Sequence, residues 1–381
     1  MTPRSRSRHE IRGAVLAISL VTLVTAGVLA ATGRDEPATP RQAALSADAT
    51  PVAYSPPSDR ARKVWTQAEL RSAAPFPLPE VAATGARSAT VPSGAPGAIP
   101  GQRADGSTPP GTGAESPEDT VATRAVDPRS YDYPAPYTAY KIPRKEVRKW
   151  PRATVGVFFF TRDGSGWRCS AASVGNFAVL TAGHCVHDGM SDPYVGEGWS
   201  EDAVFIPAYD DSRPCPGLGC KFGIWTANHL WVAGGWAPFE DYGRDTGGAV
   251  LDRLDGRKIS QVVGSLGFAW DWPTTSPSSH WNLLGYPAQN PYNGRRMITC
   301  QASYAYSILP GTIAVGCDMT GGSSGGPWVR DFGTGNYING VNSFGRIGLD
   351  EMGSPYFDET TWCLYDALTR SRPGEAAAPA C

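Results

Sequence analysis

Charge of either sign is scarce in this sequence. Only 18% of the 381 residues are charged, and 34 basic against 36 acidic side chains leave a formal net charge of −2. Proteins hold nucleic acid largely through lysine and arginine, so a chain without a basic excess is not expected to bind it. Cysteine is also missing from the first 168 residues, which excludes a disulfide scaffold in that part of the chain.

The first 32 residues are predicted to direct export. Four arginines lie within the first 12 residues, and the stretch 13–31 that follows carries no charge. A basic region before an apolar run is typical of a secretory signal, and the length of 13–31 also suits an uncleaved membrane anchor. Both interpretations stay open. In either case the rest of the chain is secreted or anchored at the cell surface, where cysteines oxidise.

Residues 33–143 are rich in Ala, Pro, Gly, Ser and Thr and contain few large apolar side chains. Such a composition buries too little surface to offset the entropy of ordering, so we expect a largely disordered, low-complexity region. An exception is Arg60–Arg71, where Val64, Trp65 and Leu70 are spaced for one or two turns of helix. A cell-envelope linker and a removable propeptide are equally good interpretations of the region.

Short β-strands are predicted after Trp150. Residues 153–160 form a β-branched and aromatic run, and Gly175-Asn176 is a turn signal between two further apolar stretches. No long helical period occurs before residue 344, and only Glu359–Arg370 has the pattern of a modest helix. Residues 144–381 are therefore predicted to form an all-β unit with a short C-terminal helix.

Ser324 is a candidate nucleophile. It lies in Gly321-Gly-Ser-Ser-Gly-Gly-Pro327, whose glycines let the backbone turn sharply and bring N–H groups near a reacting carbonyl. A serine hydroxyl is a poor nucleophile until a base takes its proton, and histidine suits that task at neutral pH. Of five histidines, His184 is the candidate base, because it follows an apolar strand and is fixed by Cys185 beside it.

A carboxylate is then needed to fix the histidine tautomer and stabilise its cation. Asp245 immediately precedes an apolar strand that continues to Leu251. Asp241 is a rival with a similar local sequence, but a strand following it would have to bury Arg244 and Asp245, which is costly. Asp245 is therefore predicted to be the orienting residue.

The order of these residues along the chain separates three classes of hydrolase. The run around Ser324 also fits the G-x-S-x-G elbow of α/β-hydrolases, where the catalytic histidine follows the serine. Here the last histidine, His280, precedes Ser324, so that class is excluded. Subtilisin order requires an Asp before His184 in a parallel α/β pattern, which is absent. The order His184, Asp245, Ser324 is that of chymotrypsin.

The motifs around these residues resemble those of one family. Thr181-Ala-Gly-His-Cys185 and Gly322–Pro327 are similar to the His and Ser signatures of the chymotrypsin-fold serine proteases, and the resemblance extends roughly over residues 150–344. Residues 318–327 and 284–287 look most like the bacterial glutamyl-endopeptidase, or V8-like, branch. The resemblance implies two six-stranded antiparallel β-barrels with the site between them, within a trypsin-like protease domain at 144–381.

The same resemblance implies roles for further residues. The backbone N–H groups of Gly322 and Ser324 would form the oxyanion hole. Residues that would line the substrate-binding strand and pocket are Asp318, Asn342, Ser343, Phe344 and Gly345. A preference for acidic or for basic residues before the scissile bond is left open. Ser323 stands where trypsin-type zymogens have an Asp that pairs with a freed N-terminus, so activation by that ion pair is not expected.

Eight cysteines allow 105 pairings. The resemblance implies Cys169–Cys185 across the histidine loop. Cys215 and Cys220 are close enough in sequence to close a small loop. Cys300–Cys317 would brace the strand leading to Ser324, and Cys363–Cys381 would fix the C-terminus.

The predicted function is that of an extracytoplasmic serine endopeptidase that cleaves protein or peptide substrates through an acyl-enzyme. No cofactor and no metal are expected, and the protein is expected to be a monomer. A catalytically silent homologue that serves as an extracellular binding module is the alternative. Labelling by a fluorophosphonate separates the two, because only an activated serine reacts.

Overall fold

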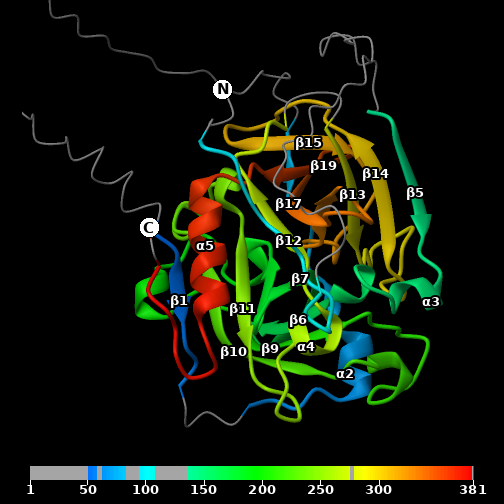
Figure 1. Ribbon diagram of the computed structural model, residues 1–381, viewed down its shortest axis with the longest axis vertical. Coiled ribbons are helices and arrows are strands. Elements are labelled where there is room, and N and C mark those ends of the chain that lie inside the picture. The colour runs from blue at the N-terminus through cyan, green and yellow to red at the C-terminus, as the bar shows by residue number, and fades with distance from the viewer. Residues whose placement is uncertain (1–49, 58–61, 83–93, 108–134, 275–278, 380) are drawn as a thin grey trace, which may run out of the picture.

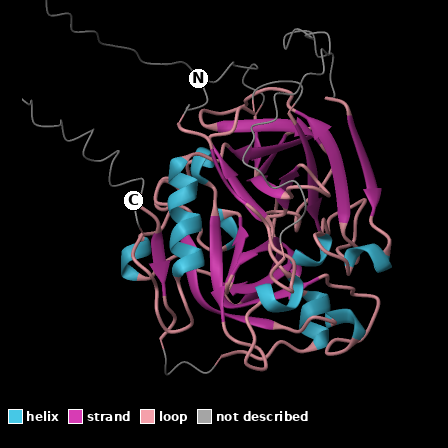
Figure 2. Cartoon of the chain, in the orientation of Figure 1, coloured by secondary structure: helices cyan, strands magenta, loops and turns pink. Residues whose placement is uncertain are grey.

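The computed structural model describes residues 50–57, 62–82, 94–107, 135–274, 279–379 and 381 (Figure 1). The predicted signal peptide or anchor at 1–32 lies outside these residues. No helix in the described ranges has both the length and the apolar character needed to cross a bilayer. Strands dominate the fold, and the helices are few and mostly short (Figure 2).

Six antiparallel strands close into a first barrel, as predicted. Going around the barrel, the neighbouring strands are β9 (Glu201–Pro207), β6 (Val155–Arg162), β7 (Ser165–Gly175), β8 (Ala178–Thr181), β11 (Gly247–Leu251) and β10 (Trp225–Val232). Strand β10 pairs in turn with β9, which closes the barrel.

Strand β6 explains why this barrel is stable. Its residues are buried on both faces, because side chains alternate along a strand. Val157 and Phe159 belong to one apolar cluster, while Phe158 and Phe160 belong to another. Burying four such side chains stabilises the fold by roughly 1.5–3 kcal/mol each.

The second half consists of two sheets. The seven-stranded sheet contains β4 (Gly97–Ile99), β12 (Gly267–Trp270), β17 (Tyr337–Val341), β16 (Pro327–Arg330), β13 (His280–Gly285), β14 (Ile298–Ser303) and β5 (Tyr137–Lys141). The four-stranded sheet contains β15 (Thr312–Gly316), β19 (Leu349–Pro355), β18 (Phe344–Arg346) and β3 (Glu80–Val81). Both sheets enclose one core, to which Trp281, Trp328, Val315 and Met352 belong.

The C-terminal helix α5 (Glu359–Arg370) has the bounds that the sequence predicts. Its N-cap is Asp358, whose Oδ1 accepts a hydrogen bond of 3.2 Å from the Thr361 N–H. Leu364 and Leu368 are fully buried, and the helix lies beside β11 in Figure 1. It therefore covers one side of the first barrel.

The described segments of residues 33–143 form short strands and one helix, and the composition of the region does not indicate these strands. Strand β1 (Val52–Tyr54) pairs with β10, and β2 (Ala74–Pro75) pairs with β7. In the second half, β3 is an edge strand of the four-stranded sheet, and β4 and β5 are the edge strands of the seven-stranded sheet. The helix predicted within Arg60–Arg71 is confirmed as α2 (Gln67–Ser72), with a capping box between Thr66 and Glu69. Pairing with distant strands, rather than local composition, orders these segments.

Candidate active site

His184 and Asp245 meet because of how β8 and β11 pair. Gly247, the first residue of β11, lies opposite Thr181, the last residue of β8. The chain leaves β8 through the 3₁₀ turn Gly183–Cys185, while Asp245 lies two residues before β11. An antiparallel ladder thus places the two residues at the same end of the same strand pair.

Asp245 contacts His184 at two points. Its Oδ1 accepts a hydrogen bond of 2.8 Å from the His184 backbone N–H, and its Oδ2 lies 2.8 Å from the ring Nδ1. Both side chains are buried. A carboxylate accepts only, so Nδ1 carries the proton and Nε2 presents a lone pair. This is the tautomer that a general base requires.

The rival carboxylate lies elsewhere. Asp241 is exposed, and its Oδ1 accepts a hydrogen bond of 2.8 Å from the Gly243 N–H at the start of a 3₁₀ turn. Of the two candidates that the sequence offers, the structure brings Asp245 to the histidine.

Ser324 stands in a loop held tightly against β7. The Ser170 N–H donates to the Ser324 carbonyl oxygen (2.7 Å), and the Ser170 hydroxyl donates to the Gly322 carbonyl oxygen (2.9 Å). Gly325 has a φ of +78°, and a Cβ there would lie 1.9 Å from Thr181 Oγ1, so only glycine fits. The carbonyl oxygen of Ser324 lies 3.8 Å from Cys185 Sγ, next to His184 in sequence.

Ser324 Oγ and His184 Nε2, the predicted donor and acceptor of the catalytic proton, are both buried. Within the described part of the chain, neither Ser324 Oγ nor His184 Nε2 has a hydrogen-bond partner, so the two do not bond one another directly; Ser323 Oγ is likewise without a partner. A buried polar atom without a partner costs about 1–3 kcal/mol. Native proteins retain few such atoms, and those retained often serve chemistry.

A backbone carbonyl already bonds to one predicted oxyanion donor. The Gly322 N–H donates to the carbonyl oxygen of Phe76 at 3.0 Å. The Phe76 ring also stacks on the His184 ring, with centroids 5.7 Å apart and an interplanar angle of 22°. Gly322 has a φ of +89°, a conformation that glycine adopts without strain.

The residues predicted to bind substrate fall into two groups. Asp318 and Gly345 line a cavity of about 270 Å³ together with Asp350 and Glu351. The side chains of Asn342, Ser343 and Phe344 are fully buried. Asn342 Nδ2 donates to the Ser323 carbonyl oxygen (3.1 Å), and its Oδ1 accepts from Trp328 Nε1 (2.8 Å), so this side chain braces the loop that carries Ser324.

Three residues, Ser343, Arg162 and Ser170, make contacts in the site that have no signal in the sequence. The Ser343 hydroxyl donates to Asp245 Oδ2 at 2.5 Å, adding a third hydrogen bond to that carboxylate. Arg162 Nη2 donates to the His184 carbonyl oxygen at 3.0 Å, and burial lowers the pKa of Arg162 to about 10. Ser170 holds the loop that carries Ser324 through its backbone and its hydroxyl. Each contact joins residues far apart in sequence, which composition and spacing do not reveal.

The structure contains four disulfides, and they join the same cysteines that the sequence analysis pairs: Cys169–Cys185, Cys215–Cys220, Cys300–Cys317 and Cys363–Cys381. Cys169, His184 and Cys185 lie close enough together to hold a metal ion. Because the two sulfur atoms are bonded to each other, they offer no thiolate to a metal.

No family model and no curated protein sequence matches the chain. Among solved structures, the protease Anisep from Arthrobacter nicotinovorans is 32% identical, with a TM-score of 0.51, over 57% of this chain and 96% of its own. The chain belongs to the chymotrypsin-fold serine proteases.

A second match supports the same assignment of this protease. The thermostable serine protease AL20 from an extremophilic microorganism is also 32% identical, with a TM-score of 0.51, over 57% of this chain and 98% of its own. A Glu endopeptidase matches at 17% identity with a TM-score of 0.48, over 61% of this chain and 96% of its own. That similarity is too weak to place the protease in the glutamyl-endopeptidase branch, which stays a prediction.

Proposed function

We propose that the chain is an extracytoplasmic serine endopeptidase in which Ser324 is the nucleophile, His184 the general base and Asp245 the orienting carboxylate. The observation that carries this proposal is the pair of hydrogen bonds between His184 and Asp245, which leaves His184 Nε2 buried and without a partner. Cys185, next to His184, contacts the carbonyl oxygen of Ser324. Membership of a protease family supports the same conclusion.

The first half of the reaction forms an ester. Ser324 Oγ attacks the carbonyl carbon of the scissile peptide bond while its proton passes to His184 Nε2. The oxyanion that forms accepts hydrogen bonds from the backbone N–H groups of Gly322 and Ser324, each worth about 3 kcal/mol. The C–N bond then breaks, and the amine leaves with the proton from Nε2. An acyl group remains on Ser324.

The second half regenerates the enzyme. A water molecule gives its proton to His184 Nε2 and attacks the ester carbon, and the same N–H groups bind the second oxyanion. The carboxylic acid leaves as Ser324 Oγ recovers the proton from Nε2. Asp245 stabilises the imidazolium, and Ser343 holds the carboxylate in place. His184 Nε2 accepts or donates the proton in each transfer of the reaction.

The four disulfides support the extracytoplasmic part of the proposal. Structural disulfides form and persist mainly in oxidising compartments. All eight cysteines of the chain are paired, and none of them is free. Protein or peptide substrates follow from the family, and the apolar and charged groups of the cavity beside Asp318 would receive the side chain that precedes the scissile bond.

The test compares two neighbouring serines. Ser324→Ala and Ser323→Ala each remove one buried hydroxyl without a partner, so their effects on folding should be alike. With a mixed peptide library as substrate, Ser324→Ala should lower kcat/KM by at least about 10⁴-fold, whereas Ser323→Ala should retain most activity. Equal activity of the two variants would contradict the proposal. A folded wild-type protein, freed of residues 62–81, that neither cleaves peptides nor reacts with a fluorophosphonate would instead favour the binding module.

A further inference from the structure

A segment of the chain's own N-terminal region crosses the proposed active site. We define residues 62–81 as the strap; it contains α2, β2 and β3. At its centre, the Phe76 N–H donates to the Arg168 carbonyl oxygen (2.9 Å), and the Phe76 carbonyl oxygen accepts from the Gly322 N–H (3.0 Å). The strap thus bonds both halves of the molecule and occupies a donor that the reaction needs for its oxyanion.

We propose that the strap is a built-in inhibitor, which blocks the active site as an uncleaved peptide ligand until it is removed or displaced. This inference rests on the proposed function, because it takes Ser324, His184 and Gly322 as the catalytic groups. It also decides between the two interpretations of residues 33–143 for this segment: the strap acts as a propeptide rather than as a linker.

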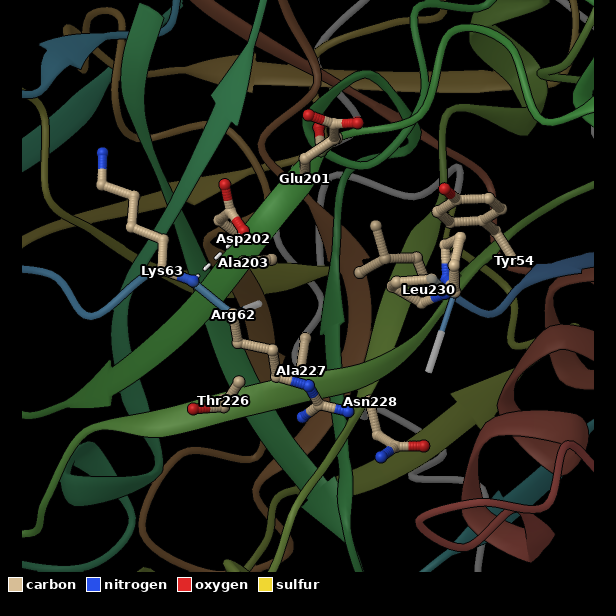
Figure 3. Close-up of a pocket in the computed structure, with 13 residues that line it drawn as sticks. Tyr54, Arg62, Lys63, Glu201, Asp202, Ala203, Thr226, Ala227, Asn228 and Leu230 are labelled. Carbon is tan, nitrogen blue, oxygen red and sulfur yellow. Dashed lines mark hydrogen bonds between the residues drawn. The ribbon is translucent and has the colours of Figure 1, made fainter. Parts of the chain in front are cut away.

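The first part of the strap is an anchor. Trp65 is buried, its Nε1 donates to the Asp202 carbonyl oxygen (2.8 Å), and its ring packs against Phe159. Leu70 on α2 is fully buried. Figure 3 shows the beginning of the strap, where the Lys63 backbone N–H donates a hydrogen bond of 3.5 Å to Asp202 Oδ1. Both residues line a cavity of about 30 Å³, which is too small for a substrate.

A buried arginine fixes the end of α2. The Arg168 side chain is 4% exposed and donates three hydrogen bonds to strap carbonyl oxygens, at Leu70 (3.0 Å), Arg71 (3.0 Å) and Ala73 (2.8 Å). Such charge-assisted bonds are stronger than neutral ones, and they satisfy carbonyls that the helix end leaves free. Arg168 lies on β7 of the first barrel, so the barrel itself positions the residues that enter the site.

Phe76 fills the space above the catalytic histidine. Its ring contacts the rings of Phe160 (5.6 Å), Trp167 (5.3 Å) and His184 (5.7 Å), and the Arg162 guanidinium lies 5.0 Å from its centre. With the strap in place, His184 is 3% exposed and Ser324 is 0% exposed. No substrate carbonyl can reach the two residues while this ring and the carbonyl of Phe76 stay where they are.

The strap then continues into the second half. The Gly345 N–H donates to the Pro79 carbonyl oxygen (2.8 Å), and β3 pairs in parallel with β18. Leu78 and Glu80 line the same cavity as Asp318 and Gly345. The strap therefore occupies the groove that would receive the substrate on that side as well.

The chemistry of the strap explains why it is not cleaved where it crosses the site. The bond after the carbonyl held by Gly322 is Phe76–Pro77, so the leaving nitrogen would belong to a ring that fixes its φ angle and leaves it little freedom to turn towards His184. Beyond Pro77 the chain runs along β18. The Phe76 ring stacks on His184 and so occupies the space in which a leaving nitrogen would receive its proton from this histidine. Pro75, Pro77 and Pro79 alternate through the crossing, and their fixed φ angles reduce the entropy lost on binding.

The test measures access to Ser324 in the full chain. Protein exported with residues 62–81 still attached, as verified by intact mass, is reacted with a fluorophosphonate, and the labelling rate is followed. Phe76→Ala should label at least about tenfold faster than wild type, because the blocked state is less populated. Tyr54→Ala is the matched control. It removes a ring that stacks on Trp199 at 5.3 Å in the same N-terminal region, outside the site, and should change the rate less than twofold.

A second experiment keeps the inference testable if Phe76→Ala unfolds, which melting curves would reveal. Leu78→Ala removes an apolar contact in the cavity and should also speed labelling. A synthetic peptide of residues 72–82 should slow the labelling of either variant, while a peptide of reversed sequence should not. Wild type that labels as fast as Phe76→Ala, or the appearance of a fragment ending at Phe76, would overturn the inference and leave the proposed function intact. If no form labels, including protein freed of the strap, the proposed function fails, and the inference fails with it.

Discussion

Asp245 accepts hydrogen bonds from both the backbone N–H and the ring of His184, each at 2.8 Å. The backbone bond fixes where the turn after β8 lies, and the ring bond fixes which way the imidazole faces. A single buried carboxylate thus sets the position and the tautomer of the proposed base. The contacts of this carboxylate lead to the first two predictions.

Replacing Asp245 by asparagine should abolish most of the activity without unfolding the protein. The amide keeps the size of the side chain, but its NH₂ group favours the wrong tautomer of His184 and cannot stabilise the imidazolium. We expect kcat/KM to fall by about 10³–10⁴-fold at neutral pH. Asp241→Asn is the matched control, since Asp241 only caps a surface turn, and it should stay within about threefold of wild type. A similar loss in both variants would contradict the assignment of Asp245.

Ser343 should act as a positioning residue. Ser343→Ala removes the 2.5 Å hydrogen bond to Asp245 Oδ2 and leaves the carboxylate less firmly held. We expect kcat to fall by about tenfold with little change in KM, as when an outer partner of a catalytic group is lost. Ser173→Ala is the control, because Ser173 is also buried and bonds a backbone carbonyl oxygen, that of Gly264, at 2.8 Å. An effect of Ser343→Ala on KM alone would mean that it binds substrate instead.

Stability should decrease as the pH falls below about 6.5. Burial lowers the pKa of His187 from its ordinary value of 6.5, although Asp188 partly opposes this. His187 Nδ1 accepts a hydrogen bond from the Gly189 N–H, and protonation at that nitrogen would break it. The unfolded state therefore takes up the proton first, so the stabilisation is complete above pH 6.5 and is lost as the pH falls from there towards the lowered pKa.

Melting temperatures at pH 7.5 and pH 5.5 test this prediction. Each 1 kcal/mol lost should lower the Tm by about 2–4 °C in a domain of this size. The fall in Tm should be smaller in His187→Gln than in wild type. Burial also lowers the pKa of His280, but this residue lies at an exposed position on β13, where water screens the effect, so His280→Gln should keep most of the fall. An unchanged pH dependence in His187→Gln would show that other groups cause it.

The cavity beside Asp318 should favour a basic side chain before the scissile bond. In the lining of this cavity, Arg346 forms an ion pair with Glu351, with 3.3 Å between Nη1 and Oε2. The charges of these two residues cancel, so the carboxylates of Asp318 and Asp350 give the lining a net negative charge. Peptides that differ only at this residue should be cleaved at least about tenfold faster with Lys or Arg than with Glu. Asp318→Asn should reduce the ratio of the cleavage rate with Lys or Arg to the cleavage rate with Glu. Faster cleavage after Glu would instead favour the specificity of the glutamyl-endopeptidase branch.

The sequence indicates the candidate site residues more directly than it indicates the contacts around them. His184, Asp245 and Ser324 stand out because nucleophilic chemistry needs these side chains, and their order along the chain excludes two other hydrolase classes. The first barrel and α5 follow from strand and helix patterns that are local. Ser343, in contrast, looks like part of a substrate-binding strand, and only the fold shows that its hydroxyl meets Asp245.

The strap shows the limit of local patterns most clearly. Residues 74–81 contain three prolines and no regular apolar period, so composition alone indicates disorder. Their order comes from β7 and β18, strands about 90 and 260 residues away along the chain. Only Trp65 and Leu70, before them in the chain, provide a local signal. Non-local pairing of this kind cannot be deduced from one sequence.

The most direct test of the central claim is to locate the reactive residue in the purified enzyme. Wild-type protein freed of the strap is treated with a fluorophosphonate, digested and mapped by mass spectrometry, with His184→Ala treated in parallel. The account predicts one adduct, on Ser324, that forms at least about 10³-fold more slowly in His184→Ala. An adduct on another residue, or labelling of Ser324 that does not depend on His184, would contradict it.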